Sequence, residues 1–391
     1  MNILLVAPQP FYEERGTPIA VRLLAQALCA QGHRVDLVTY HLGADIACEG
    51  LRLSRIPRLP GIRRMPIGFS LQKLACDFFL FFKVARRMLR GRYDVVHCVE
   101  ESIFFTLLLP KRGARVVYDM DSSMADQLVE KWPALRAASG LFNACERRAV
   151  RRADLVLPVC DALAEKVRAH APGKPLMVLS DVALRGDESG PPSEDIRHGL
   201  PPDAVVALYV GNLESYQGVG LLIEALARTG PDARVHLIVI GGEARDVAAL
   251  RAQAQALGVA GRCRMLGPRP VAGLAGYLRQ ADILVSPRLR GANTPMKIYS
   301  YMAAGRAILA TNIHSHTQVL DDRTARLAAP TAEALAAGLG ALAADEGSRR
   351  ALGTAAAARA EERHTVAAYR RVVDSAYRRL RVSAAASPGR P

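Results

Sequence analysis

Short apolar runs alternate with amphipathic stretches along the first half of the chain. The runs at 3–7 and 35–39 predict strands, and one-faced apolar spacing over 19–30 predicts a helix between them, ended by Gly32. This strand–helix–strand order is typical of a parallel sheet. Further strands are predicted at 95–98, 116–118 and 155–159, so the first half is interpreted as an α/β domain.

The second half repeats this pattern. Strands are predicted at 205–210, 235–240, 265–266, 283–285 and 307–310, and helices at 219–227 and 296–304. The Ala-rich stretch 332–360 is helical by propensity, a last helix is expected at about 361–381, and the tail from Ser383 is expected to be disordered. The Gly- and Pro-rich stretch 181–202 favours a linker between two doubly wound α/β domains, 1–180 and 203–364. A cleft forms if their ligand crevices, at the carboxyl ends of the strands, face each other.

Composition excludes several classes of protein. Apolar residues make up 50% and charged residues 23%, which is typical of a globular chain, and no apolar run approaches the roughly 20 residues of a membrane-spanning helix. The opening MNILLVAPQP is interpreted as a strand because it has no basic flank and no cleavage site. The seven cysteines form no CxxC pair, so reduced thiols in a cytosolic protein are expected rather than disulfides. No metal site is expected, and His314 and His316 are interpreted as part of a loop.

A strand end, a basic loop and a helix start follow one another at 286–305. Arg288 and Arg290 lie in the loop, Pro295 begins the helix, and Lys297 lies in its first turn. Amides at a helix start attract anions, and cations beside them favour a diphosphate, although a solvated basic loop is the alternative. Weaker candidates of the same kind lie in the other strand-to-helix loops, where an ordinary connection explains each equally well: Gly16 and Thr17, Gly211, Asn212 and Gln217, and Gly241 and Gly242.

These segments together resemble the GT-B glycosyltransferases of family 4, the glycosyl transferases group 1. The resemblance covers nearly the whole chain and includes GHRVDLVT (32–39), YDVVHC (93–98), RRADLVLPVC (151–160), YVGNLESYQGVGLLIEAL (209–226), LGPRPVAGLAGYLRQADILVSP (266–287) and PMKIYSYMAAGRAILAT (295–311). It implies two Rossmann-like domains facing an interdomain cleft. It also implies an acceptor in the first domain, a nucleotide-diphosphate sugar mostly in the second, and a last helix, about 365–382, that packs back on the first.

The resemblance and the charge pattern together suggest roles for single residues. Lys297 and Arg288 would stabilise the departing diphosphate without a metal or another cofactor. Asp121, or one of the other strand-end carboxylates Glu100, Glu101 and Asp119, would take the acceptor's proton or hold the sugar. Donor contacts would come from the strand-to-helix loops, from the backbone around Arg269 and Val271, which would hold the nucleotide's base, and from the helix that begins near Pro295. The residues expected to make them are Gly16, Thr17, Gly211, Asn212, Gln217, Gly241, Gly242, Arg269, Val271, Asn293, Thr294, Pro295, Met296 and Ser300.

The chain departs from the family pattern at five positions. Ala292 and Ser300 stand where acidic residues usually contact the donor sugar and ribose. Asn212 and Gln217 replace the usual Arg and Lys after the first strand of the second domain, and Asp121 stands where a His is common. These changes are typical of a divergent subgroup, in which Lys297, Arg288 and Arg290 would supply the missing positive charge. Asn293 or Ser300 would supply the hydroxyl contacts.

Positive charge is concentrated in one stretch of the first domain. The formal net charge is +15, and residues 51–92 contain eleven Lys or Arg and one acid, Asp77. Arg63 and Arg64 precede a helix expected over about 70–90, which carries Phe78 and Phe79. Cations beside an apolar face favour an anionic membrane surface or an acceptor, and a core helix with a solvated basic face is the alternative. The clustering of the aromatic rings disfavours nucleic acid.

The sequence thus predicts a glycosyltransferase that moves a sugar from a nucleotide-diphosphate donor to a lipid-linked or glycan acceptor of the cell envelope, with retention of configuration. It is expected in the cytoplasm, bound peripherally to the inner face of the membrane. The alternatives are a binding or scaffold protein that has lost catalysis, and a nucleotide-sugar epimerase of the same architecture.

Overall fold

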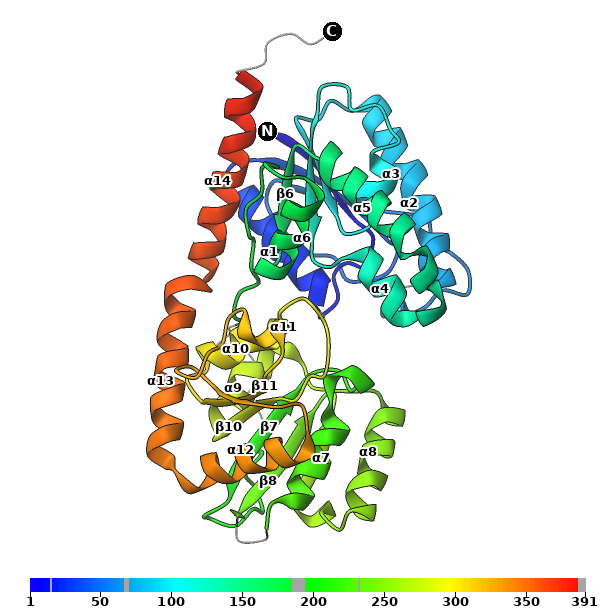
Figure 1. Ribbon diagram of the computed structural model, residues 1–391. Coiled ribbons are helices and arrows are strands. Elements are labelled where there is room, and N and C mark those ends of the chain that lie inside the picture. Colours follow the sequence, from blue (N-terminus) through cyan, green and yellow to red (C-terminus); the bar gives the residue numbers. More distant parts are fainter. Residues whose placement is uncertain (15, 67–69, 185–193, 231–232, 386–391) are drawn as a thin grey trace. The chain divides into compact units, whose positions relative to one another are not determined.

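The computed structural model describes residues 1–14, 16–66, 70–184, 194–230 and 233–385 (Figure 1). The chain forms two compact units, one of residues 1–180 together with the chain from Tyr369 onward, and one of residues 181–368. The stretch predicted as a linker, 181–202, is grouped with the second unit, and its residues 185–193 lie outside the described part of the chain.

The first unit is built on a parallel six-stranded sheet of order β3-β2-β1-β4-β5-β6. Its central strands are almost entirely buried because helices cover both faces of the sheet. The edge strand β3 instead contains two arginines, Arg52 and Arg55, and none of its residues is fully buried. The strands are β1 (Asn2–Ala7), β2 (Arg34–Thr39), β3 (Leu51–Arg55), β4 (Val95–Val99), β5 (Arg115–Met120) and β6 (Leu155–Pro158).

The helices of the first unit pack on this sheet through narrow apolar stripes. They are α1 (Gly16–Ala30), α2 (Leu71–Arg90), α3 (Ser102–Thr106), α4 (Met124–Lys131), α5 (Ser139–Arg152), α6 (Asp161–His170) and the part of α14 (Val366–Ala385) from Tyr369 onward. In α2 the buried residues are spaced four apart, at Cys76, Leu80, Val84 and Met88. One stripe of a largely apolar helix therefore enters the core, and the flanking apolar side chains stay outside it.

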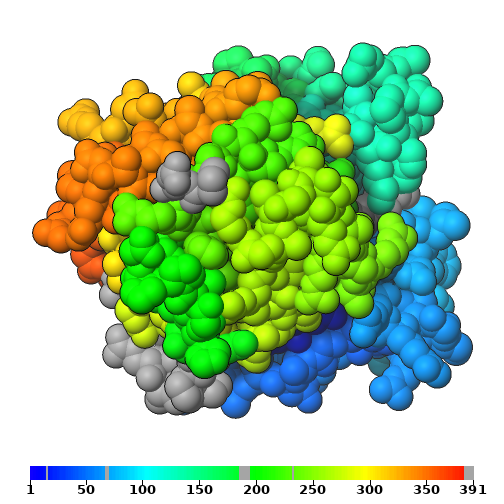
Figure 2. Space-filling model, turned by 90° about the horizontal axis from the view of Figure 1, so that it is seen from below, coloured from blue at the N-terminus to red at the C-terminus, as the bar shows by residue number. Residues whose placement is uncertain are grey.

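The second unit contains another parallel six-stranded sheet, of order β12-β11-β10-β7-β8-β9. Its strands are β7 (Val205–Val210), β8 (Val235–Ile240), β9 (Cys263–Gly267), β10 (Ile283–Ser286), β11 (Ala307–Thr311) and β12 (Arg326–Ala328). Its helices are α7 (Val219–Arg228), α8 (Ala244–Ala256), α9 (Leu274–Gln280), α10 (Met296–Ala303), α11 (His314–Thr317), α12 (Ala332–Ala344) and α13 (Glu346–Arg363). Apolar clusters line both faces of the sheet, and α12 (orange) packs beside α7 (green) in Figures 1 and 2.

The structure corrects several boundaries predicted from the sequence. Strands β3 and β12 were not predicted, because short edge strands with arginines lack the apolar signal of central strands. The stretch 332–360 forms two helices, since Asp345 ends α12 and its carboxylate then caps the start of α13 by accepting the Ser348 amide at 2.9 Å. The last helix begins at Val366 and continues to Ala385, and residues 386–391 lie outside the described part of the chain.

A buried polar chain joins α14 to the first sheet. The His97 imidazole lies 3.2 Å from the Asp119 carboxylate through Nε2 and 2.8 Å from the Tyr377 hydroxyl through Nδ1. Because the carboxylate only accepts, Nε2 carries the proton and Nδ1 accepts from Tyr377. The last helix is thus held to the first unit by a specific contact between groups buried in its core.

Candidate functional site

The second sheet places its ligand crevice at the carboxyl ends of β7 and β10. The chain leaves β7 towards β8 and β9 on one side, then returns to β10 and β11 on the other. A topological switch point of this kind is where open α/β sheets bind ligands. The loops there lead into α7 and α10, so the starts of two helices lie at this edge of the sheet.

Lys297, in the first turn of α10, is a desolvated cation paired with a neutral group. Its ammonium donates to the Gln217 side-chain oxygen at 3.0 Å and lies 4.0 Å from the centre of the Tyr209 ring. Burial, and secondarily the charge of Arg288, hold the pKa of Lys297 well below its ordinary value. An anion at this point would supply the charge compensation that the amide and the ring do not.

Three glycines explain how the loops approach so closely. Gly211 has φ +152°, and a Cβ there would lie 2.8 Å from the Lys297 ammonium nitrogen. Gly241 has φ +113°, and its Cβ would lie 2.0 Å from the Gly211 carbonyl oxygen, while a Cβ on Gly242 would collide with Leu213. The chain ends of β7 and β8 are therefore packed backbone to backbone, which a side chain would prevent.

Arg288 shapes the loop before α10 from the inside. The residue is 7% exposed, and its guanidinium donates to the carbonyl oxygens of Arg290 and Asn293 at 2.7 and 2.8 Å and to the Asn293 side-chain oxygen at 3.1 Å. Gly291 is required beside it, because a Cβ would lie 2.0 Å from the guanidinium. Arg288 thus stabilises the conformation of the loop through hydrogen bonds to the loop's own oxygens. The sequence had suggested a direct contact between Arg288 and the leaving group.

Thr294 and His316 complete the surroundings of this loop. The Thr294 hydroxyl is buried and has no hydrogen-bond partner among the described residues. Burial lowers the pKa of His316 to about 4, so its ring is neutral at pH 7. Nδ1 then donates to the Thr311 carbonyl at 2.8 Å, and Nε2 accepts from the Ser286 hydroxyl at 2.9 Å. His316 is a fully buried brace between β10 and β11, whereas His314 is exposed.

The remaining predicted donor residues occupy three kinds of place. Asn293, Pro295 and Met296 lie at the start of α10, and the Asn212 carbonyl accepts from the Tyr209 hydroxyl at 2.6 Å. Ser300 is buried, and its hydroxyl accepts the Leu184 amide at 3.0 Å. Arg269, just before Val271 in the loop after β9, pairs with Glu194 at 2.8 Å. Gly16 and Thr17 belong to the first unit, at the start of α1.

A second candidate site lies at the carboxyl ends of β4 and β5 in the first unit. Glu100 follows β4 with φ 52°, a left-handed conformation that is strained for a residue with a side chain. Its carboxylate accepts the Ser122 hydroxyl at 2.7 Å. Burial and the neighbouring charge of Glu101 raise the pKa of Glu100 to about 7. The switch point of this sheet lies between β1 and β4, so a carboxyl that titrates near neutrality stands beside it.

Two residues near the start of α2 extend this cluster, and the sequence did not single them out. Lys73 pairs with Glu101 at 2.5 Å, and the Asp77 carboxylate accepts the Tyr40 hydroxyl at 2.5 Å. Burial and Glu101 raise the pKa of Asp77 to about 7. Asp121, predicted as the base, follows β5 and is half-buried. The only signal for Lys73 and Asp77 was their place in the basic helix.

The outward face of α2 is apolar. Phe78, Phe79 and Phe82 are 59%, 39% and 54% exposed, and their rings contact one another edge to face. Arg63 and Arg64 lie exposed in the loop before α2. No helix in the described ranges combines the length and the apolar character needed to cross a membrane. No group of three or more His, Cys, Asp or Glu side chains in those ranges is arranged to hold a metal ion.

Comparison with known proteins identifies the class. Residues 204–345 match the family described as "Glycosyl transferases group 1", and residues 15–180 match the "Glycosyl transferase 4-like domain". These two matches fall on the two sheet-based units with their carboxyl-end sites. The chain therefore belongs to the group 1 glycosyltransferases, family 4, and has the GT-B fold of two Rossmann-like α/β units.

Individual relatives agree with this assignment. A phosphatidyl-myo-inositol mannosyltransferase of Mycolicibacterium smegmatis is 26% identical over 347 residues, 85% of this chain and 82% of that protein. Sucrose-phosphate synthase of Thermosynechococcus elongatus has a TM-score of 0.80 at 21% identity, over 98% of this chain and 99% of its own. HepE of Anabaena, solved in complex with UDP, has a TM-score of 0.74 at 16% identity, over 97% and 100% of the two chains. The chain is a glycosyltransferase, and the structural likenesses show its fold.

Proposed function

We propose that the enzyme transfers a hexose from a nucleoside-diphosphate sugar to a lipid-linked or glycan acceptor of the cell envelope. The observation that carries the donor proposal is the Lys297 ammonium, which lies at the start of α10 with a neutral hydrogen-bond partner. The buried Thr294 hydroxyl, which lacks a partner among the described residues, offers the same ligand a hydrogen bond. Amides, an ammonium and a hydroxyl are the groups that a diphosphate requires.

The chemistry follows from where charge develops. The bond between the sugar's anomeric carbon and the diphosphate oxygen breaks, and the leaving diphosphate gains negative charge. Lys297 and the first amides of α10 stabilise that charge, and Arg288 positions the loop that surrounds them. A new bond forms between the anomeric carbon and the acceptor oxygen, whose proton passes to a carboxylate. We assign retention of configuration on the family resemblance. Without a carboxylate nucleophile, retention requires the acceptor oxygen to attack from the same face that the diphosphate leaves. The anomeric form of the product, read by NMR, tests it.

Glu100 is proposed as the carboxylate that receives this proton. A base is most effective when its pKa is near the working pH, and the pKa of Glu100 is about 7. Acceptor turnover, measured as kcat/KM, should therefore rise through about pH 7 and then level off. Glu100→Gln should abolish most turnover and its rise with pH. Asp77→Asn is the matched control, because the pKa of Asp77 is also about 7. The assignment would be contradicted if the rise of kcat/KM through pH 7 remained in Glu100→Gln but disappeared in Asp77→Asn.

Membrane docking is proposed for the exposed face of α2. Phenylalanines beside cations suit an anionic interface, and the similar mannosyltransferase is named for a phosphatidyl-inositol acceptor. Lipid-linked acceptors would be reached from that surface.

The donor proposal is tested with a panel of nucleotide sugars. UDP, GDP and their hexose derivatives are added to the full chain, and the melting temperature is recorded. At a ligand concentration 100-fold above Kd, the donor should stabilise the fold by about 2.7 kcal/mol. The stabilising donor is then incubated with envelope lipids and glycans to find the labelled product. If no nucleotide or nucleotide sugar shifts the melting temperature, the proposal fails.

A further inference from the structure

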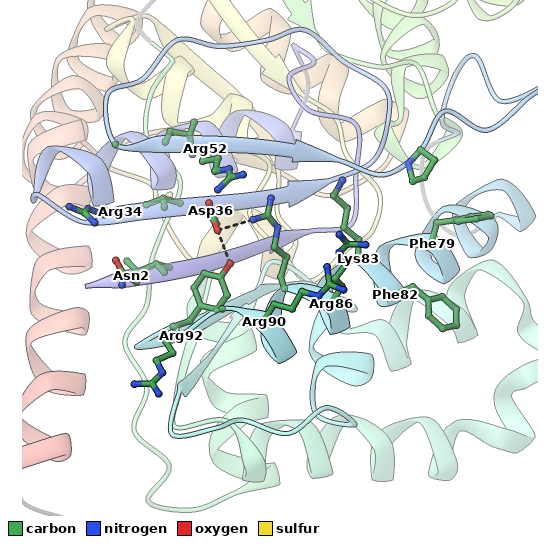
Figure 3. A pocket seen from close by; sticks show the side chains of 18 residues that line it. Asn2, Arg34, Asp36, Arg52, Phe79, Phe82, Lys83, Arg86, Arg90 and Arg92 are labelled. Atoms are coloured by element: carbon green, nitrogen blue, oxygen red, sulfur yellow. Dashed lines mark hydrogen bonds and ion pairs between the residues drawn. The ribbon is translucent and has the colours of Figure 1, made fainter.

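A large pocket lies at the opposite edge of the first sheet from the candidate site described above. It has a volume of about 1180 Å³ and is bounded by the starts of β1, β2 and β3 and by the second half of α2 (Figure 3). The residues that place it there are Asn2, Arg34 and Leu51, each the first or second residue of its strand. The lining also reaches Pro57, just beyond the end of β3, but it includes none of Glu100, Glu101, Asp119 and Asp121, so this amino-edge pocket is distinct from the carboxyl-end site that contains Glu100.

Positive charge dominates the amino-edge pocket. Seven of its lining residues are basic, against one carboxylate, Asp36. That carboxylate is already used, because it pairs with Arg87 at 3.5 Å and accepts the Tyr93 hydroxyl at 2.6 Å. The seven basic residues are Arg34, Arg52, Lys83, Arg86, Arg87, Arg90 and Arg92.

Most of these cations have no ion-pair partner in the described part of the protein. Five of the arginines are exposed, and in the described ranges their guanidinium groups make no ion pair or hydrogen bond; they are Arg34, Arg52, Arg86, Arg90 and Arg92. Lys83 donates to the Arg55 carbonyl, and its pKa is lowered by burial and by the charges of Arg87 and Arg86. Like charges gathered in one hollow repel each other, and an anion that bridges them removes that repulsion.

Apolar rings close one end of the pocket. Figure 3 shows Phe79 and Phe82 at the end beyond Lys83 and Arg86, with Arg34 and Arg92 at the other. Both rings are substantially exposed, and Phe82 joins Phe78 on the apolar face of α2. A free phosphate would use the cations and leave the rings in water. A phospholipid at an interface uses both, since its phosphate meets the arginines while the rings enter the acyl boundary.

We propose that the amino-edge pocket binds the phosphate headgroup of an anionic phospholipid, with Phe79 and Phe82 inserted beside it. The inference rests on the proposed membrane docking and goes further, because it names a discrete headgroup site away from the chemistry. Occupation of the pocket would hold α2 against the membrane while the carboxyl ends of the same sheet stay available for the acceptor.

The test compares two double variants of equal charge in the full-length protein. Arg86→Ala with Arg90→Ala removes two exposed cations from the pocket, and Arg147→Ala with Arg148→Ala removes two exposed cations from α5. Binding is measured by co-sedimentation with phosphatidylcholine vesicles that contain or lack phosphatidylglycerol. At about 1 kcal/mol per cation near the surface, the pocket variant should bind roughly thirty-fold more weakly, and the α5 variant less than about threefold. Circular dichroism confirms that both variants fold.

Each outcome decides between the proposals. If the unaltered enzyme does not bind vesicles that contain phosphatidylglycerol, both the membrane-docking proposal and the pocket proposal are wrong. If the enzyme binds but both double variants lose affinity equally, docking stands and the discrete pocket is excluded. Glycerol phosphate is titrated against the protein as the soluble arm. The lipid assignment would be overturned if glycerol phosphate bound tightly, if the pocket variant lost that binding, and if vesicles did not compete with it. The occupant would then be a soluble phosphate compound. Loss of vesicle binding in Phe79→Ser, with glycerol phosphate still weak, would support it.

Discussion

Replacement of Lys297 by methionine should lower activity without lowering stability. Removing one donor that stabilises developing negative charge costs roughly 10²–10³ in kcat, or about 2.7–4 kcal/mol in the barrier. The free energy of unfolding should instead stay the same or rise. The pKa of Lys297 lies well below 10.5 in the fold, so at neutral pH the unfolded chain holds this proton more readily than the folded one. The ammonium therefore costs folding free energy at pH 7, and that cost disappears as pH rises towards 10.5.

Methionine keeps most of the stem's packing and removes the buried charge, at the loss of about 1 kcal/mol for the hydrogen bond to Gln217. The melting temperature should thus be unchanged or higher, while kcat falls. Lys174→Met is the control, because the Lys174 ammonium donates to the Arg151 and Ala153 carbonyls at 2.8 and 2.7 Å in the first unit. It should keep its kcat, whatever happens to its stability, because it is not part of the start of α10.

The assay pairs turnover with thermal unfolding in the same buffer. A kcat for Lys297→Met within threefold of the unaltered enzyme would refute the leaving-group role. A melting temperature that falls in proportion to activity would instead show that Lys297 holds the fold together, and the charge argument would be wrong.

Three further predictions follow from other contacts. Gly211→Ala should weaken nucleotide binding about tenfold by calorimetry, because its Cβ would lie 2.8 Å from the Lys297 ammonium; Gly261→Ala, with no atom within 4 Å of the new Cβ, should not. Tyr377→Phe should lower the free energy of unfolding in urea by about 1–3 kcal/mol, since it leaves a buried imidazole nitrogen without its donor; an unchanged midpoint would argue against this bond. The His316 ring should titrate near pH 4 by NMR, and stability should fall by up to about 3 kcal/mol between pH 6.5 and 4 as the unfolded chain takes up the proton; titration near 6.5 would contradict its burial.

The sequence predicted where the helix of the candidate donor site begins, but not the contacts that its residues make. A strand end, a basic loop and Pro295 were enough to place a helix start at 296, and α10 begins at Met296. Lys297 and Arg288 looked equivalent as two cations in one loop. The fold separates them, because Arg288 donates to oxygens of its own loop, whereas among the described residues Lys297 contacts an amide oxygen and an aromatic ring and no carboxylate. Tyr209 gave no signal beyond being an aromatic residue near the end of a strand.

Local pattern, then, was sufficient for what depends on neighbours along the chain: the parallel α/β class, the central strands such as β1 and β7, and the starts of α2 and α10. Tertiary structure decided what depends on residues far apart in sequence. Gln217 meets Lys297 across 80 positions, and Arg87 meets Asp36 across 51. Whether a cation is compensated or left available to a ligand is set by such long-range partners, because electrostatic energy follows distance in space and burial rather than order along the chain. For the same reason, only the fold shows that one stripe of α2 is buried and that its phenylalanines and arginines border a pocket.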